Sequence, residues 1–294
     1  MTYADSREYR ERPYYVPHES HWPIVGAVGL FITMLGVSTW LNGSDAAFWV
    51  FMAGVLVIIF MLAGWFNDVI AESTGDMYNK QVDMSFRMGM FWFIFSEVMF
   101  FSAFFGALFY ARSMVIPWLG GGSNNFFTNL MLWEGYEAGW PTNGPANVGG
   151  EFIAMEPFGL PLINTAILLT SSVTVTIAHH ALIANHRNML KVFLGLTFLL
   201  GFIFVGLQAE EYVIAYQEMN LKLTSGIYGS TFFMLTGFHG LHVTIGAIML
   251  FIVWLRVMKG HFSPNSHFAF EATAWYWHFV DVVWLGLYVF VYWI

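Results

Sequence analysis

The sequence predicts an all-α integral membrane protein with seven transmembrane helices. Hydrophobic residues make up 57% of its 294 residues, and charged residues make up only 10%, whereas soluble domains carry about a quarter charged residues. The apolar residues lie in long continuous runs, and about 20 such residues cross the hydrocarbon core as one helix. Because these runs do not alternate with polar residues, a transmembrane β-barrel is disfavoured.

Seven apolar runs are long enough to cross the membrane. About four residues join the first two, so we expect a tight helical hairpin over 23–66. The other five are expected to form a bundle over 87–294, interrupted by a long Gly-, Asn- and Pro-rich connection over 113–158. The predicted spans are 23–41, 46–66, 87–111, 160–184, 190–212, 227–255 and 272–294.

The basic residues orient these spans. Nine Lys and Arg residues fall on one side and two on the other, and Lys and Arg favour the cytoplasmic side. We therefore expect a multi-pass protein of a bacterial inner membrane, with the N-terminal segment 1–22 in the cytoplasm. The C-terminus and the connection 113–158 are expected in the periplasm. The nine residues are Arg7, Arg10, Arg12, Lys80, Arg87, Arg187, Lys191, Arg256 and Lys259, and the two are Arg112 and Lys222.

Several classes of function are excluded by composition. The chain has no cysteine, which removes thiolate metal ligands, iron–sulfur clusters, disulfides and a cysteine nucleophile. It also has no basic stripe of the kind that binds nucleic acid.

Glu97 is the clearest polar residue inside the predicted spans. It lies about 15 Å from the cytoplasmic end of the third span at helical rise, where desolvation favours the neutral acid. A carboxyl at this depth either holds a helix contact by one hydrogen bond or has a proton- or lipid-linked role.

Two further polar groups lie inside later spans. His239 and His242 are three residues apart on the sixth span, and structural hydrogen bonding is the better interpretation than haem ligation because no histidine of another span matches their depth. His278 and Asp281, also three residues apart, are expected to form one polar pair on the seventh span.

A basic cluster lies where the sixth span ends. Arg256, Lys259 and His261 are either an ordinary positive-inside anchor or a site for phospholipid phosphates.

Depth along the helices predicts one contact between spans. His242 lies about 20 Å from the inner end of its span, close to the depth of Glu97. A neutral acid and a neutral imidazole can satisfy each other without placing net charge in lipid. We therefore expect Glu97 to hydrogen-bond His242, provided that the third and sixth spans are neighbours.

Several long motifs resemble subunit III of the haem–copper cytochrome c oxidases. They are Gly229 to Phe233, Thr236 to His242, Phe270 to Ala272, Trp275 to Trp284, Ser96 to Val98, Ala178 to His180, and Asp68 to Ile70 with Glu72 to Thr74. The resemblance covers nearly the whole chain except the polar N-terminus and the connection 113–158. It departs from the family at Asn67 and Ala71, where relatives often carry arginines.

The resemblance implies a non-redox core subunit of an aa3-type oxidase, the respiratory enzyme that reduces oxygen to water and pumps protons. Such a subunit holds no cofactor, because haem a and copper lie in partner subunits. It packs against subunit I, with subunit II and a small accessory subunit expected in the same complex. It also protects the oxidase from turnover inactivation and supports proton uptake into subunit I.

The resemblance also implies roles for particular residues. The first hairpin and the five-helix bundle are separated by a V-shaped cleft that holds phospholipids, and Arg256, Lys259, His261 and Glu72 are the candidate lipid-binding residues. Glu97 matches the family carboxylate that reacts with carbodiimide.

Two other functions remain open from the sequence. Subunit III of a quinol oxidase shares the last five helices but typically lacks the first hairpin, which 23–66 supplies here. A proton-coupled transporter could use Glu97 and the histidines as a relay, but the sequence has no internal repeat of the kind found in many transporters.

Overall fold

The computed structural model describes residues 14–16, 19–44 and 46–293. Within these residues the chain is helical, with one isolated β-bridge between Ser263 and Ser266 and no strand. In this described part of the chain seven helices are long and apolar enough to cross a membrane, which confirms the predicted all-α class with seven spans. They are α2 (Trp22–Leu41), α3 (Ala47–Thr74), α4 (Lys80–Tyr110), α7 (Leu160–Ile183), α8 (Arg187–Gln217), α9 (Gly226–Met258) and α10 (Phe268–Leu287). The predicted basic residues Arg7, Arg10 and Arg12 lie outside the described residues.

The chain forms two compact units, Met1–Met88 and Gly89–Ile294. The first unit contains the hairpin of α2 and α3, which is packed so tightly that glycine is required at the contact. A Cβ on Gly36 would overlap the backbone of Phe51, and one on Gly54 would overlap the backbone of Thr33. Close approach through small residues is the usual way in which membrane helices gain dispersion energy.

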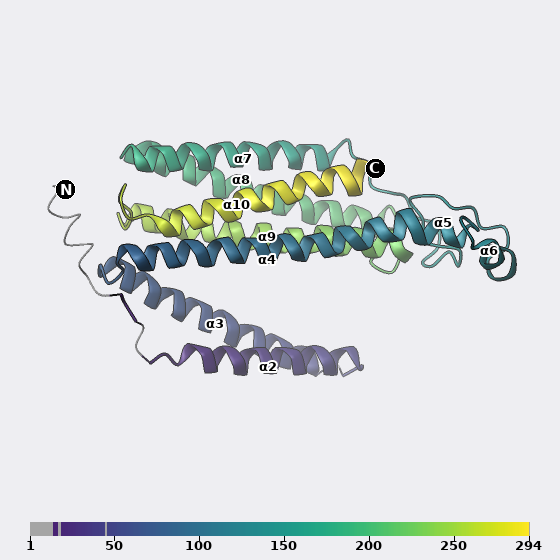
Figure 1. Cartoon of the computed structure of the whole chain (residues 1–294), viewed down its shortest axis with the longest axis horizontal. Coiled ribbons are helices and arrows are strands. Elements are labelled where there is room, and N and C mark those ends of the chain that lie inside the picture. The colour runs from purple at the N-terminus through teal and green to yellow at the C-terminus, as the bar shows by residue number, and fades with distance from the viewer. Residues whose placement is uncertain (1–13, 17–18, 45, 294) are drawn as a thin grey trace. The chain divides into compact units, whose positions relative to one another are not determined.

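The second unit is a helical bundle (Figure 1). In it α7 packs against α8, α8 against α9, α9 against α10, and α10 back against α7. Large side chains fill the centre, and Phe204, Trp277 and Trp284 are all fully buried. The indole N–H of Trp277 donates to Ser171 Oγ and that of Trp284 to Thr165 Oγ1, both over 2.9 Å, so these aromatic residues also satisfy their polar atoms.

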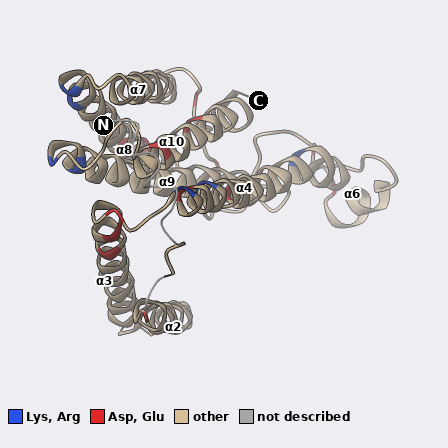
Figure 2. Cartoon of the chain, turned by 60° about the vertical axis from the view of Figure 1, so that its left-hand side comes forward, with Lys and Arg blue, Asp and Glu red and all other residues tan. Residues whose placement is uncertain are grey.

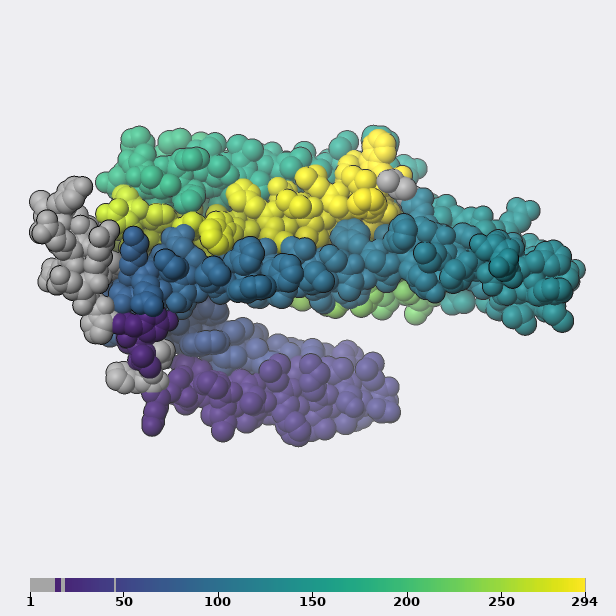
Figure 3. All heavy atoms as spheres, viewed as in Figure 1, coloured from purple at the N-terminus to yellow at the C-terminus, as the bar shows by residue number. Residues whose placement is uncertain are grey.

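Helix α4 lies along this bundle through aromatic rings rather than close backbone contact. Phe93 stacks on Tyr276 and Phe101 packs on Phe279, so α4 runs beside α10 (Figure 3). Phe100 meets Phe238 of α9 edge-on, with ring centroids 5.1 Å apart. The large rings hold α4 at a distance from α9 and α10 that a long polar side chain can also bridge.

Some helices extend beyond the predicted spans because a helix can continue past its apolar stretch. α3 runs to Thr74 rather than ending near residue 66, and α4 begins at Lys80 rather than near residue 87. α4 also continues through the π-helical segment η1 (Ala111–Val115) into α5 (Ile116–Leu119), and the connection 113–158 contains a further helix, α6 (Phe126–Leu132). Charged and polar residues such as Asp68, Glu72 and Asp83 stop an apolar run, but they do not stop a helix.

Candidate functional site

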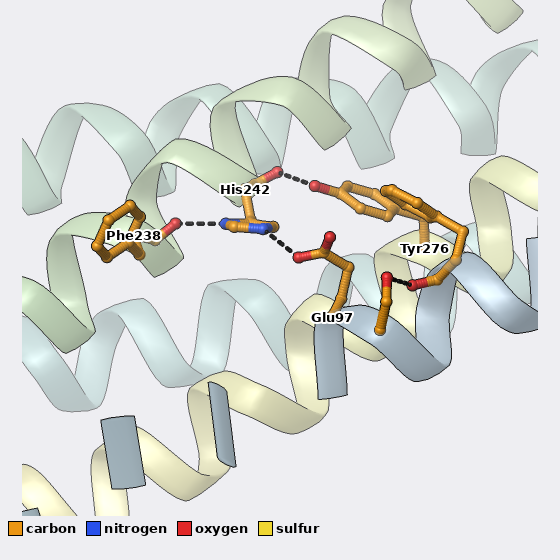
Figure 4. Close-up of polar contacts among 6 residues, drawn as sticks. Glu97, Phe238, His242 and Tyr276 are labelled. Atoms are coloured by element: carbon orange, nitrogen blue, oxygen red, sulfur yellow. Dashed lines mark hydrogen bonds and ion pairs between the residues drawn. The ribbon is translucent and has the colours of Figure 1, made fainter. Parts of the chain in front are cut away.

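The predicted hydrogen bond between Glu97 and His242 is present. His242 Nε2 lies 2.9 Å from Glu97 Oε2 and joins α9 to α4 (Figure 4). The side chains are 13% and 20% exposed, so the contact is largely withdrawn from the surface of the chain. The estimate of depth along each span therefore identified the correct partner. The observed hydrogen bond also shows that the third and sixth spans are neighbours.

The hydrogen bond of the second ring nitrogen of His242 shows how many protons the contact with Glu97 holds. Nδ1 lies 2.6 Å from the carbonyl oxygen of Phe238, and because a carbonyl only accepts, Nδ1 carries a hydrogen. The contact between Nε2 and Glu97 then holds one proton, either on the carboxyl or on the imidazole. In both forms the pair has no net charge, which suits a site at bilayer depth.

Aromatic side chains enclose this pair. The rings of Phe100 and Phe101 lie 6.0 and 5.1 Å from the His242 ring, centroid to centroid. The hydroxyl of Tyr276 points to the carbonyl oxygen of His242 over 3.4 Å (Figure 4). The arrangement can hold a proton between two groups and can tie two helices together.

Glu97→Gln tests whether the carboxyl acts mainly by that hydrogen bond. The Gln amide can donate to His242 Nε2 as the protonated acid does, so we expect the variant protein to fold and to keep nearly its full stability. Glu97→Ala leaves the imidazole lone pair unsatisfied and should loosen the helix contact by about 1 kcal/mol. The check is the thermal stability of the purified protein together with carbodiimide labelling, which should vanish in both variants. A loss of stability in Glu97→Gln as large as that in Glu97→Ala would contradict this role of the carboxyl.

His239 is fully buried and faces the centre of the bundle. Its Nε2 donates to the carbonyl oxygen of Val280 over 3.1 Å, and its ring lies 5.1 Å from that of Trp284. The hydrogen bond gives His239 a structural partner on α10. Each histidine of the sixth span therefore makes a hydrogen bond to a neighbouring helix, which agrees with a structural role.

The predicted pair of His278 and Asp281 is not formed by a hydrogen bond or ion pair among the described residues. His278 Nε2 instead lies 3.3 Å from Thr176 Oγ1 on α7. Asp281 Oδ1 is buried and has no hydrogen-bond partner in the described part of the chain. Spacing by three residues places both side chains on one helix face. His278 nevertheless contacts Thr176 of the neighbouring helix α7 rather than Asp281.

The basic residues of the second unit gather where α8 begins and α9 ends (Figure 2). We call this the basic end, formed by Arg187, Lys191, Arg256 and Lys259. Arg187 Nη1 donates to the carbonyl oxygen of Phe262 over 2.8 Å, and Trp254 Nε1 donates to that of Lys191 over 3.0 Å. The first bond joins the start of α8 to the α9–α10 connection, and the second joins α9 to α8. Arg112 and Lys222 belong to the opposite end.

Arg256 lacks the partner that a buried guanidinium normally has. The residue is 9% exposed and lies over the Phe262 ring, 4.5 Å from its centroid. Its Nε is buried without a hydrogen-bond partner, and no carboxylate pairs with it in the described part of the chain. Beside it, partial burial and the charges of Arg256 and Lys259 lower the pKa of His261. The cluster is therefore short of negative charge.

Glu72 lies in the first unit and is held by two tyrosines. Tyr15 donates to Oε1 over 2.9 Å and Tyr78 donates to Oε2 over 2.5 Å. The pKa of Tyr15 is raised mainly by this hydrogen bond to the carboxylate, and that of Tyr78 by burial and then by the same bond. Nearby, Trp22 Nε1 donates to Asp68 Oδ2 over 2.7 Å, which ties the start of α2 to α3.

One buried acid, Glu211 on α8, was not foreseen. Glu211 is fully buried and accepts a 2.6 Å hydrogen bond from the hydroxyl of Tyr292, which lies in the π-helical segment η2 (Tyr288–Trp293). The sequence held a signal, since Glu210 and Glu211 are adjacent and neighbours on a helix point about 100° apart. The two adjacent acids therefore point in different directions, and Glu211 is the one that faces inward.

These features define a polytopic α-helical membrane protein. The described residues contain seven helices able to span a membrane, the Glu97–His242 pair and the basic end. The family model of cytochrome c oxidase subunit III matches residues 12–294. Similar proteins include cytochrome c oxidase subunit 3 of Drosophila melanogaster, 42% identical over 282 residues and 96% of each chain. The same subunit of Coturnix japonica is 41% identical over 95% of this chain and 96% of its own, and that of Heterololigo bleekeri is 40% identical over 96% and 97%.

The chain therefore belongs to the cytochrome c oxidase subunit III family. It is a subunit of a redox-driven, proton-pumping oxidase and is itself non-catalytic. The family match sets aside the transporter, and the names of the relatives favour cytochrome c oxidase over quinol oxidase.

Proposed function

We propose that this chain is the lipid-binding, non-redox core subunit of an aa3-type oxidase in a bacterial inner membrane. It stabilises subunit I, contacts subunit II and a small accessory subunit, and supports proton uptake. Haem a and copper belong to the partner subunits. The basic end faces the cytoplasm, because Lys and Arg favour that side.

The observation that carries the lipid-binding role is the buried guanidinium of Arg256 without a carboxylate partner. A cation at the edge of the hydrocarbon region is stabilised by a phosphate, which accepts charge-assisted hydrogen bonds from it. Lys259 and His261 stand beside Arg256 and add donors to the same position. Glu72 already accepts two phenol hydrogen bonds, so a lipid would meet it through an amine or hydroxyl of its headgroup. The presence of phospholipids between the first hairpin and the five-helix bundle remains a prediction.

The experiment that tests this function compares the oxidase with and without this chain. Complex from cells that lack the chain should keep its haem content and its initial rate, because the redox centres lie elsewhere. It should lose activity faster during turnover, and added phospholipid should not restore it. Equal persistence of the two complexes during turnover would contradict the proposal.

The pKa of His261 gives lipid binding a pH dependence. Since burial and the two cations lower that pKa, the imidazole is neutral near pH 7, and a bound phosphate would raise the pKa again. Binding then takes up a proton, so affinity must rise as pH falls through the interval between the two pKa values. We expect phosphatidylglycerol to bind more tightly at about pH 6 than at about pH 8.

The measurement is the lipid affinity of the delipidated complex at the two pH values. His261→Gln should flatten the dependence while leaving part of the affinity, because Arg256 and Lys259 remain. An affinity of the wild-type complex that does not change with pH would contradict this role of His261.

A further inference from the structure

Three side chains at the basic end converge without a role in lipid binding. They are His179 near the end of α7, His267 directly before α10, and Glu271 in the first turn of α10. One ring nitrogen of each histidine and one carboxylate oxygen lie within 4.8 Å of one another. All three residues are half-buried, so an ion from the aqueous phase can reach them.

A hydrogen bond sets the tautomer of His267. Its Nδ1 lies 3.1 Å from the carbonyl oxygen of Ser263, and since a carbonyl only accepts, Nδ1 carries the hydrogen and Nε2 is left with its lone pair. Metal-binding histidines are typically oriented by such a hydrogen bond from the other ring nitrogen to a backbone carbonyl. The ring is therefore held in the tautomer that can bind a cation.

His179 is held by rings rather than by hydrogen bonds. Its ring centroid lies 5.5 Å from that of Phe270 and 5.6 Å from that of His267. Its Nε2 is buried and has no hydrogen-bond partner among the described residues. A buried ring nitrogen without a partner is costly, and a coordinated metal, or a water held by one, would relieve this.

The donor set selects the kind of ion. Two neutral imidazoles and one carboxylate carry a net charge of −1 and suit Zn²⁺ or a similar transition metal, while Ca²⁺ and Mg²⁺ prefer oxygen donors. Bonds of about 2.0–2.1 Å in a tetrahedral site place ligand atoms about 3.4 Å apart. Binding therefore requires side-chain rotations that shorten separations of up to 4.8 Å to that value.

We propose that His179, His267 and Glu271 form a binding site for a zinc-class divalent metal at the basic end. The bound ion fastens the start of α10 to the end of α7, with water completing its coordination. The site differs from the proposed phosphate position in its residues, because its ligands come from α7, from the residue before α10 and from α10 rather than from the end of α9.

The test is zinc binding to the purified oxidase complex. After treatment with a chelator, Zn²⁺ is titrated against a chromophoric competitor in the wild-type complex and in variants. We expect His179→Ala and His267→Ala each to lose one zinc equivalent per complex, or to weaken it at least tenfold. His180→Ala is the matched control, because His180 is adjacent and exposed but outside the group. It should bind zinc as the wild-type complex does.

Retention of this chain and of the haem spectrum reports whether each variant assembles. An unchanged zinc stoichiometry and affinity in assembled His179→Ala and His267→Ala complexes would overturn the proposal. If these variants fail to assemble, crystals of the wild-type complex soaked in Zn²⁺ decide. An anomalous difference peak between His179, His267 and Glu271 at the zinc edge supports the site, and its absence at saturating zinc refutes it.

Discussion

Gly54→Leu in α3 is expected to break the first helical hairpin. The new side chain would occupy the space of the Thr33 backbone on α2, and backbone cannot move aside as a flexible side chain does. Overpacking of a tight contact lowers protein stability by about 1–3 kcal/mol. Because the overlap here is with backbone, we expect a loss of at least about 3 kcal/mol for this variant. We expect a loss of several degrees in thermal stability and a large fall in the amount of chain recovered with the oxidase.

The control for this variant is Gly206→Leu in α8. An added Cβ at Gly206 meets no atom within 4 Å, and the residue is exposed on a long helix. The control should retain wild-type stability, because leucine is also the better helix former. Wild-type stability and recovery of Gly54→Leu would show that α2 and α3 do not pack as closely as described.

Arg256→Ala is expected to release phospholipid from the basic end. The guanidinium donates charge-assisted hydrogen bonds that contribute about 1.5–3 kcal/mol when the acceptor is charged, so affinity should fall by roughly 10- to 100-fold. Native mass spectrometry of the detergent-purified complex should show at least one lipid fewer per complex. Arg256→Lys keeps the charge but not the planar donor group, and should retain lipid partially.

Lys222→Ala is the control for this loss, because Lys222 lies at the opposite end of the bundle. Its lipid content should match the wild-type complex apart from any lipid at that end. Unchanged lipid retention in Arg256→Ala would contradict phosphate binding by this residue. Any change in the haem spectrum would show instead that the variant disturbs the partner subunits.

The spans could be predicted from the sequence because each is a long apolar run. The pair in Figure 4 could be predicted from helical rise once the third and sixth spans were assumed to be neighbours. The number of residues from a span end gives depth, and two polar groups at equal depth in lipid are the natural partners. The ends of α3 and α4 were predicted less well, because hydropathy marks the edge of the hydrocarbon region and not the end of a helix.

Contacts that depend on which helix faces which could not be predicted in this way. His278 was expected to pair with Asp281 on its own helix, yet Thr176 of α7 lies against it. The group of His179, His267 and Glu271 arises only because α10 packs against α7. Glu211 is similar, since its partner Tyr292 comes from the far end of the chain. The sequence pattern predicts the depth of a residue in the membrane and the helix face on which it lies. Which helices are neighbours is known only from the packed bundle.

The central claim is that this chain is a non-redox subunit of a haem-bearing oxidase. The most direct measurement is the optical spectrum and metal content of the complex, isolated through a tag on this chain from mildly solubilised native membranes. The spectrum should show haem a together with subunits I and II. After the chain is detached, all haem and copper should remain with the partners. Isolation of the chain without haem-bearing partners, or haem iron that stays with the detached chain, would contradict the claim.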